Sequence, residues 1–188
     1  MIIALAGRRI DAPDASTPRF PLERADVVAE RIGKEFARLH AGILVCSAAC
    51  GADLIALRVA RGRGMRRRIV LPFDAAIFRE KSVTDRPGSA KWDWGRLFDE
   101  LYGEARAGGE LVVVDHGGGG NDDAYKNANQ RIIEEAEALR ASSGAPAAGA
   151  ISAMIVWEGG PRGEGDLTME FAERARAGGF EVVPVLTN

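Results

Sequence analysis

The chain has 188 residues, of which 46% are hydrophobic and 28% charged, and its formal net charge is −2. This length fits one domain with a full core, and the charge balance gives no argument for nucleic acid or an anionic membrane as a partner. Its scattered cysteines and histidines (His40, Cys46, Cys50, His116) exclude a structural zinc pattern or a disulfide framework, so we expect no metal and a reducing, cytoplasmic setting.

The first apolar run, at 2–6, predicts a strand that is too short to span a membrane and lacks a basic leader. Further strands are predicted at 42–46, 69–71, 111–114, 150–157 and 181–186. Helical patterns lie between them, at 22–40, 52–63, 73–82, 92–107, 124–140 and 166–177. This alternation predicts one Rossmann-like α/β nucleotide-binding domain over 1–188: a three-layer sandwich with a mostly parallel sheet of about six strands.

Only small residues separate the second strand from the helix that follows, apart from Asp53 at the helix start. Gly51 can take a positive φ or admit a ligand oxygen close to the backbone. The free amides and the dipole of the next helix favour an anion. We interpret this loop as a phosphate cradle formed by Ser47, Ala48, Cys50, Gly51 and Asp53. The alternative is a tight strand-to-helix connection that small residues fit.

Three more loops are expected at the same edge of the sheet, at 7–9, 115–123 and 158–168, where ligands of parallel sheets bind. The four glycines at 117–120 predict a mobile loop, either a lid or a connection without function. The loops and the helix after 123 add candidate ligand-binding residues: Gly7, Arg8, Arg9, Tyr125, Asn129, Gly163, Gly165 and Thr168. For Arg8 and Arg9 the alternative is a turn with two solvated arginines.

Two further expectations concern charge and reactivity. The arginines at 61–68 crowd a helix end without aromatic neighbours, which favours a solvated surface and makes nucleic acid an unexpected partner. Cys50 opens a helix, so we expect a stabilised, reactive thiolate, whereas Cys46 lies in an apolar strand and is expected to be inert.

The stretch Ser47-Ala48-Ala49-Cys50-Gly51-Ala52-Asp53 resembles the Ser-Gly-small-x-Gly-x-Asp signature of the SLOG superfamily. That group includes the DNA-processing Smf proteins and the Lonely Guy phosphoribohydrolases. The segments 4–13 and 70–73, and Trp157 with its glycine loop, resemble bacterial members joined to nucleotide cyclases or repeat proteins. The resemblance implies a Rossmann-like fold that binds nucleotides or nucleotide-derived signals.

The Lonely Guy enzymes carry Pro-Gly-Gly-x-Gly-Thr-x-x-Glu before the last helix, and this chain departs from that motif. Thr168 matches the threonine, but Glu170 follows it by two residues instead of three, a rotation of about 100° around a helix. We therefore expect a binding or sensing domain for a phosphate-bearing, nucleotide-derived small molecule, without a cofactor. The alternative is an N-glycoside hydrolase acting on a nucleoside monophosphate, with Glu170, Asp53 or Glu80 as catalytic carboxylates. A homodimer is left open.

Overall fold

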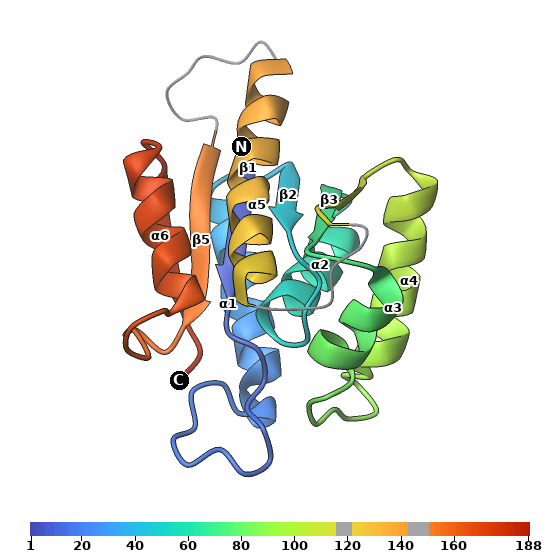
Figure 1. The fold of residues 1–188 in the computed structure, drawn as a ribbon. Coiled ribbons are helices and arrows are strands. Elements are labelled where there is room, and N and C mark those ends of the chain that lie inside the picture. The colour runs from blue at the N-terminus through green and yellow to red at the C-terminus, as the bar shows by residue number, and fades with distance from the viewer. Residues whose placement is uncertain (116–121, 143–150) are drawn as a thin grey trace.

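The computed structural model describes residues 1–115, 122–142 and 151–188 (Figure 1). The glycine loop expected at 117–120, and most of the flexible segment expected at 141–149, lie outside these residues. The strands are β1 (Ile2–Gly7), β2 (Ile43–Cys46), β3 (Arg66–Leu71), β4 (Leu111–Val113), β5 (Ile151–Trp157) and β6 (Glu181–Leu186). The helices are α1 (Ala25–Arg38), α2 (Ala52–Gly62), α3 (Ala75–Phe78), α4 (Trp94–Ala107), α5 (Asp122–Ser142) and α6 (Leu167–Ala177).

The six described strands form one sheet in the order β4-β3-β2-β1-β5-β6, and every pairing between them is parallel. The chain builds outward from β1 to β4, then returns to the other side of β1 for β5 and β6. The direction therefore changes between β1 and β5, where Gly7 pairs with Val156. Ligands of open α/β sheets bind outside the carboxyl ends of the strands at such a switch point.

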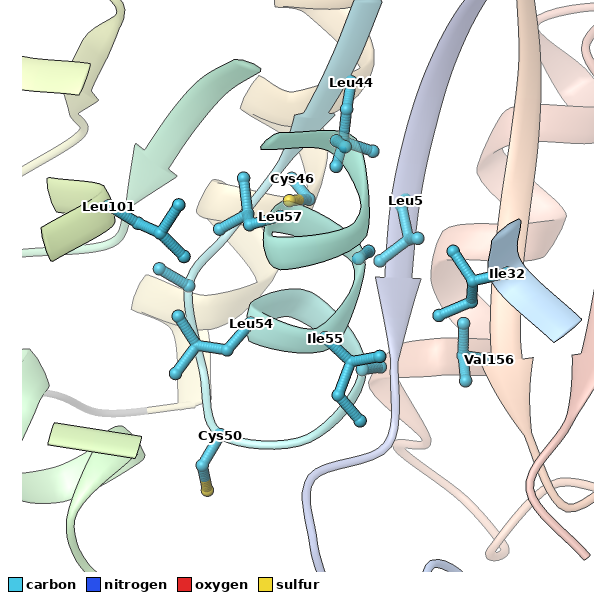
Figure 2. Packing of buried hydrophobic residues seen from close by; sticks show 14 of the residues in the cluster. Leu5, Ile32, Leu44, Cys46, Cys50, Leu54, Ile55, Leu57, Leu101 and Val156 are labelled. Carbon is cyan, nitrogen blue, oxygen red and sulfur yellow. The ribbon is translucent and has the colours of Figure 1, made fainter. Parts of the chain in front are cut away.

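Helices cover both faces of the sheet, which confirms the predicted three-layer α/β sandwich (Figure 1). Side chains alternate along β1: Ile3 and Leu5 face the core with α1, α2 and α4, whereas Ile2 and Ala4 face α5 and α6. In Figure 2, Leu54, Ile55 and Leu57 of α2 pack among strand and helix side chains. The β1 strand is buried on both sides, as its unbroken apolar run predicts.

The prediction that the arginines at 61–68 form a solvated surface was wrong for Arg66, Arg67 and Arg68. β3 begins at Arg66, three residues before the expected start, so Arg66, Arg67 and Arg68 belong to the sheet. Arg67 pairs with Glu104 at 2.9 Å, and Arg68 pairs with Glu110 at 2.8 Å and with Glu135. Carboxylates from distant segments thus accept the charges that we expected water to solvate.

Two helix predictions were also only partly correct. The helix expected from residue 22 begins as a 3₁₀ turn (Leu22–Arg24), and α1 proper starts at Ala25. The helix expected at 73–82 is the short α3, which Asp74 caps, followed by a π-helical turn η2 (Arg79–Val83). None of the described helices is long and apolar enough to cross a membrane.

Candidate functional site

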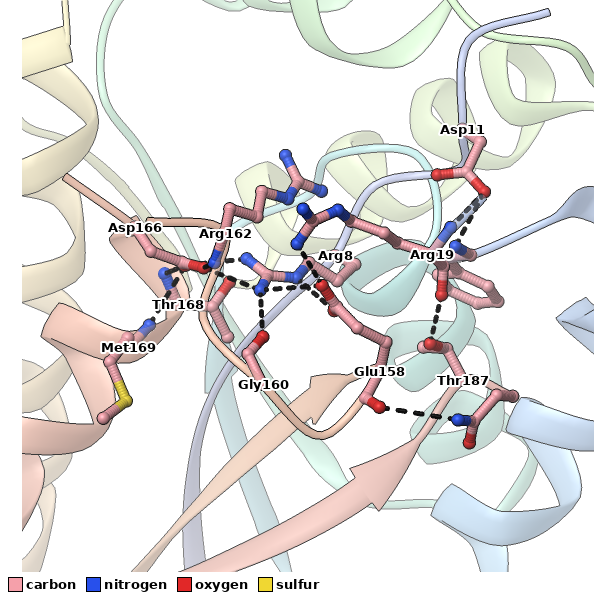
Figure 3. Close-up of polar contacts among 12 residues, drawn as sticks. Arg8, Asp11, Arg19, Glu158, Gly160, Arg162, Asp166, Thr168, Met169 and Thr187 are labelled. Carbon is pink, nitrogen blue, oxygen red and sulfur yellow. Dashed lines mark hydrogen bonds and ion pairs between the residues drawn. The ribbon is translucent and has the colours of Figure 1, made fainter. Parts of the chain in front are cut away.

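Arg8 lies directly after β1, and its side chain forms hydrogen bonds across the switch point (Figure 3). Its Nη1 and Nη2 donate to the two carboxylate oxygens of Asp166, each at 2.7 Å. Its Nε donates to Glu158 Oε2 at 2.7 Å, and Nη2 also reaches the Gly160 carbonyl oxygen at 3.0 Å. We call this set the Arg8 clamp: Arg8, Glu158, Gly160 and Asp166. The clamp ties the end of β1 to the loop between β5 and α6.

The clamp is both buried and fully charged. The side chains of Arg8 and Asp166 are 3% and 1% exposed. Burial alone would raise the pKa of Asp166, but the Arg8 guanidinium and backbone amides hold that pKa well below its ordinary value. Burial would lower the pKa of Arg8, but its bonds to Asp166 and Glu158 raise it. Each charge is therefore stabilised by its partner.

Asp166 is also the N-cap of α6. Its Oδ1 accepts from the amides of Thr168 at 2.9 Å and Met169 at 3.2 Å, and its Oδ2 accepts from the amide of Arg162 at 2.6 Å. These are amides that a phosphate at this helix terminus would use. In the structure a carboxylate of the chain itself occupies that position, with Thr168 buried beside it.

A large hollow of about 640 Å³ opens beside the clamp, outside the carboxyl ends of β1 and β5. We call it the larger hollow. Five arginines line it (Arg8, Arg9, Arg19, Arg86 and Arg162), against the three acidic residues Asp11, Glu164 and Asp166. Two of these carboxylates already accept hydrogen bonds from the chain, since Asp166 belongs to the clamp and Asp11 Oδ2 accepts from the amides of Arg19 and Phe20.

Several arginine N–H groups of the larger hollow lack acceptors. The Nε atoms of Arg9 and Arg86 make no hydrogen bond in the described part of the chain, although Arg9 Nη2 donates to Asp85 and Arg86 Nε lies 3.7 Å from Asp85 Oδ2. In Figure 3 the side chains of Arg162 and Arg19 point toward each other beside the clamp, and no dashed line meets the Arg162 guanidinium. Arg162 is an exposed residue, and partial desolvation of its guanidinium together with its proximity to Arg8 lowers its pKa. An anion in this hollow would meet the exposed Arg162 guanidinium and the positive charges of Arg9 and Arg86.

A second hollow, of about 120 Å³, adjoins the first, and we call it the smaller hollow. The two share Gly7, Arg9, Leu167 and Thr168. The smaller hollow gathers more than half of the sequence-predicted ligand residues from four segments of the chain, namely Gly7, Arg9, Ser47, Asp53, Tyr125, Asn129 and Thr168. The fold thus brings these predicted residues together at one part of the sheet edge.

Asp53 is the one carboxylate that lines the smaller hollow among the described residues. It is 7% exposed, and its Oδ2 accepts from the Ala49 amide at 3.1 Å. Burial raises the pKa of Asp53 to about 7, while the Ala49 amide and Arg9 act in the opposite direction. Nearby, Tyr125 and Ser82 share a hydrogen bond of 2.9 Å, and Asn129 donates to the Leu167 carbonyl oxygen at 3.1 Å.

The loop interpreted as a phosphate cradle is packed against the chain that leaves β1. Gly51 has φ +102°, and a Cβ there would lie 2.8 Å from the Arg8 carbonyl oxygen and from the Ile10 amide nitrogen. The Ala52 amide donates to that Arg8 carbonyl at 3.0 Å, and the Cys50 amide donates to Ser82. Backbone of the protein itself thus makes the close approach that we expected of a ligand oxygen.

The expectation of a reactive Cys50 is wrong. Cys50 and Ala48 are both 0% exposed, so neither side chain lines a hollow. Burial raises the pKa of the Cys50 thiol, although Arg9 acts against that shift. Burial also raises the pKa of Cys46, in agreement with its expected inertness. At Cys50 desolvation outweighs the helix dipole and the nearby guanidinium.

The remaining predicted residues divide between the larger hollow and the surface. Gly165 lines the larger hollow, whereas Gly163 does not. Glu170 lies on α6 outside both hollows, 3.9 Å from Lys126 Nζ, and Glu80 is exposed on η2. Sequence reasoning missed Arg19, Arg86 and Arg162. For Arg162 a signal was present, because it lies inside the glycine-rich loop between β5 and α6.

No known family model and no curated protein sequence matches the chain. The fold is similar to the X-ray structure of DNA processing protein A (DprA) from Streptococcus pneumoniae, with a TM-score of 0.45 and 14% sequence identity. The similarity covers 97% of this chain and 57% of that one, so this chain spans a little over half of the other's length.

Proposed function

We propose that the protein binds a phosphate-bearing, nucleotide-derived small molecule in the larger hollow. The observation that carries this proposal is the surplus of arginine donors there. Arg9 and Arg86 share a single carboxylate, that of Asp85, and Arg19 shares Glu158 with Arg8. The Arg162 guanidinium has no carboxylate within 4 Å among the described residues, so the arginines of this hollow outnumber their carboxylate partners. Arginine forks match the geometry of phosphate oxygens, and a bound anion would satisfy these groups together.

The position of the hollow supports the same function. It lies at the switch point between β1 and β5, where α/β sheets bind nucleotides. Its volume of about 640 Å³ falls within the range of roughly 300–1,000 Å³ that is usual for small-molecule sites. In this proposal Arg8 is a positioning residue, because Asp166, Glu158 and Gly160 accept its hydrogen bonds.

Binding is favoured over glycoside hydrolysis. Glu170, the carboxylate that the resemblance would place at the reaction, lies outside both hollows, close to Lys126. The remaining candidate, Asp53, lines the smaller hollow without a second carboxylate among the described residues there. Retaining and inverting glycosidases use two such groups.

The test is thermal unfolding against nucleoside monophosphates, nucleotide sugars, cyclic nucleotides and unphosphorylated nucleosides. A ligand at 100 times its Kd adds about 2.7 kcal/mol, which for a chain of this size is roughly 5–11 °C in Tm. At least one phosphorylated compound should give this shift and its unphosphorylated counterpart should not. If no phosphorylated compound moves the Tm, the proposal fails.

Two variants locate the site. Arg162→Ala should abolish the shift while leaving the Tm of the free protein unchanged or higher, because it removes a cation held beside Arg8 and Arg19. Arg174→Ala, an exposed arginine of α6 outside both hollows, is the matched control and should keep the full shift. Chromatography of the recovered ligand should show it intact. Free base and a sugar phosphate would show hydrolysis instead.

A further inference from the structure

The smaller hollow differs in chemistry from the larger one. Arg9 is the only arginine that lines it among the described residues, and the other polar groups are hydroxyls, an amide and the Asp53 carboxylate. Among the described residues, the larger hollow has five arginines against three acidic residues, whereas the smaller one has a single arginine against a single carboxylate, so a phosphate is favoured in the larger hollow only. Asp53 accepts hydrogen bonds and is the strongest acceptor in the smaller hollow, where it favours a hydrogen-bond donor.

The Asp53 carboxylate has capacity for another donor. Ala49 N–H is the one hydrogen-bond donor that reaches it in the described part of the chain, at 3.1 Å from Oδ2. A carboxylate offers about four lone-pair sites, so most of its acceptor capacity is unused. At 7% exposure the carboxylate is poorly solvated, and a donor group from a ligand would replace the water that burial excludes.

Size and position limit what that ligand group can be. The smaller hollow has a volume of about 120 Å³, less than the roughly 300 Å³ at the low end of small-molecule sites, so it takes a fragment of a ligand. The larger hollow adjoins it through Gly7, Arg9, Leu167 and Thr168. A molecule with its phosphate in the larger hollow can therefore extend a neighbouring ring into the smaller one.

We propose that the smaller hollow binds the hydroxyl-bearing sugar ring of the phosphorylated ligand, with Asp53 accepting a hydrogen bond from a sugar hydroxyl. This inference rests on the proposed phosphate site and assigns the part of the ligand that the arginines do not contact. Phe78, Ala128 and Ile132 line the apolar side of the hollow, where the carbon face of a sugar ring packs. The selected ligands are thus sugar phosphates with free ring hydroxyls, as in ribonucleotides.

The experiment compares three probes by calorimetry: inorganic phosphate, ribose 5-phosphate, and tetrahydrofurfuryl phosphate, which keeps the ring and phosphate but lacks the ring hydroxyls. We expect ribose 5-phosphate to bind at least about tenfold more tightly than tetrahydrofurfuryl phosphate, as a charge-assisted hydrogen bond implies. Asp53→Asn should reduce this ratio severalfold. Glu134→Gln, on the exposed side of α5, makes the same acid-to-amide change and should leave the ratio intact.

The ratio should also depend on pH. Among the described residues, the charged or titratable groups around Asp53 are Arg9 from the segment after β1, the Cys46 thiol of β2 and Tyr125 of α5. A hydroxyl donates better to the ionised carboxylate, so the preference for ribose 5-phosphate should rise between pH 6 and pH 8. Both sugar phosphates carry the same phosphate, whose titration cancels in the ratio, and Asp53→Asn should make the ratio independent of pH.

Two failures are distinguishable. Equal affinity for the two ring phosphates, with both bound, overturns the role of the smaller hollow and leaves the phosphate site standing. If no phosphate compound binds, the phosphate site fails, and the sugar assignment falls with it. A preference that survives unchanged in Asp53→Asn, at all pH values, would assign the hydroxyl contact to another residue and overturn the role of Asp53.

Discussion

Replacing Asp166 by asparagine tests whether the Arg8 clamp holds the switch point together. Asparagine keeps an oxygen that can cap α6 and accept from Thr168, but its amide group cannot accept from Arg8 Nη2 or from the Arg162 amide. Breaking a pair in which the side chains are 3% and 1% exposed costs up to about 3–5 kcal/mol, because the buried guanidinium keeps Glu158 as its only charged partner among the clamp residues. For this chain length that is roughly 6–20 °C in Tm.

Circular dichroism at increasing temperature and urea unfolding at pH 7 measure the loss. Asp166→Ala should lose about 1 kcal/mol more, since it also removes the helix cap. Glu30→Gln breaks the exposed pair between Glu30 and Lys34 and should leave the Tm unchanged.

The dependence of stability on pH in the acid range gives a second test of the same pair. The folded pKa of Asp166 lies below its unfolded value, so its contribution is complete above about pH 4 and is lost as pH falls through the folded pKa. The gap between wild type and Asp166→Asn should therefore narrow below about pH 4. A Tm within about 2 °C of wild type at pH 7, or a gap that does not change on acidification, would refute the reasoning.

Two further predictions concern the loop before α2. Gly51→Ala should destabilise by more than about 2 kcal/mol in urea unfolding, since φ is +102° and the new Cβ would lie 2.8 Å from the Arg8 carbonyl. Gly62→Ala, at the end of the same helix with open space around it, should be neutral or stabilising, and equal midpoints for both would contradict this account. Cys50 and Cys46 should both resist iodoacetamide at neutral pH until denaturant is added, and rapid native-state labelling of Cys50, read by peptide mapping, would contradict its burial.

The sequence was sufficient to predict the helices and strands that are marked by a pattern within the element itself. The unbroken apolar runs of β1, β2 and β5 predict central strands, and the alternation of strands and helices predicts the parallel sheet. The start of β3 could not be predicted in this way. Three consecutive arginines resemble a solvated surface until Glu104, Glu110 and Glu135, all more than 30 positions away, supply the countercharges.

At the candidate site, too, local patterns were predictable and contacts with distant residues were not. The spacing of small residues correctly placed the tight turn at Gly51, but it could not show whether a ligand or the chain leaving β1 makes the close approach. Arg8 was likewise interpreted as a phosphate contact. Its actual partners, Glu158 and Asp166, lie 150 and 158 positions away in the sequence, so no local pattern could reveal these ion pairs. Arg19 and Arg86 reach the larger hollow only through three-dimensional packing, whereas the glycine-rich loop gave a sequence signal for Arg162.

The long separation within the Arg8 clamp has a consequence for how the protein is made. β1 can pair with β2 as soon as both have been synthesised, but its other neighbour, β5, and the partner Asp166, 158 positions after Arg8, come much later. Until then the Arg8 guanidinium, directly after the central strand, has neither of its carboxylate partners and is hydrated. The contacts that close the switch point can therefore form only after residues 158–166 have been synthesised.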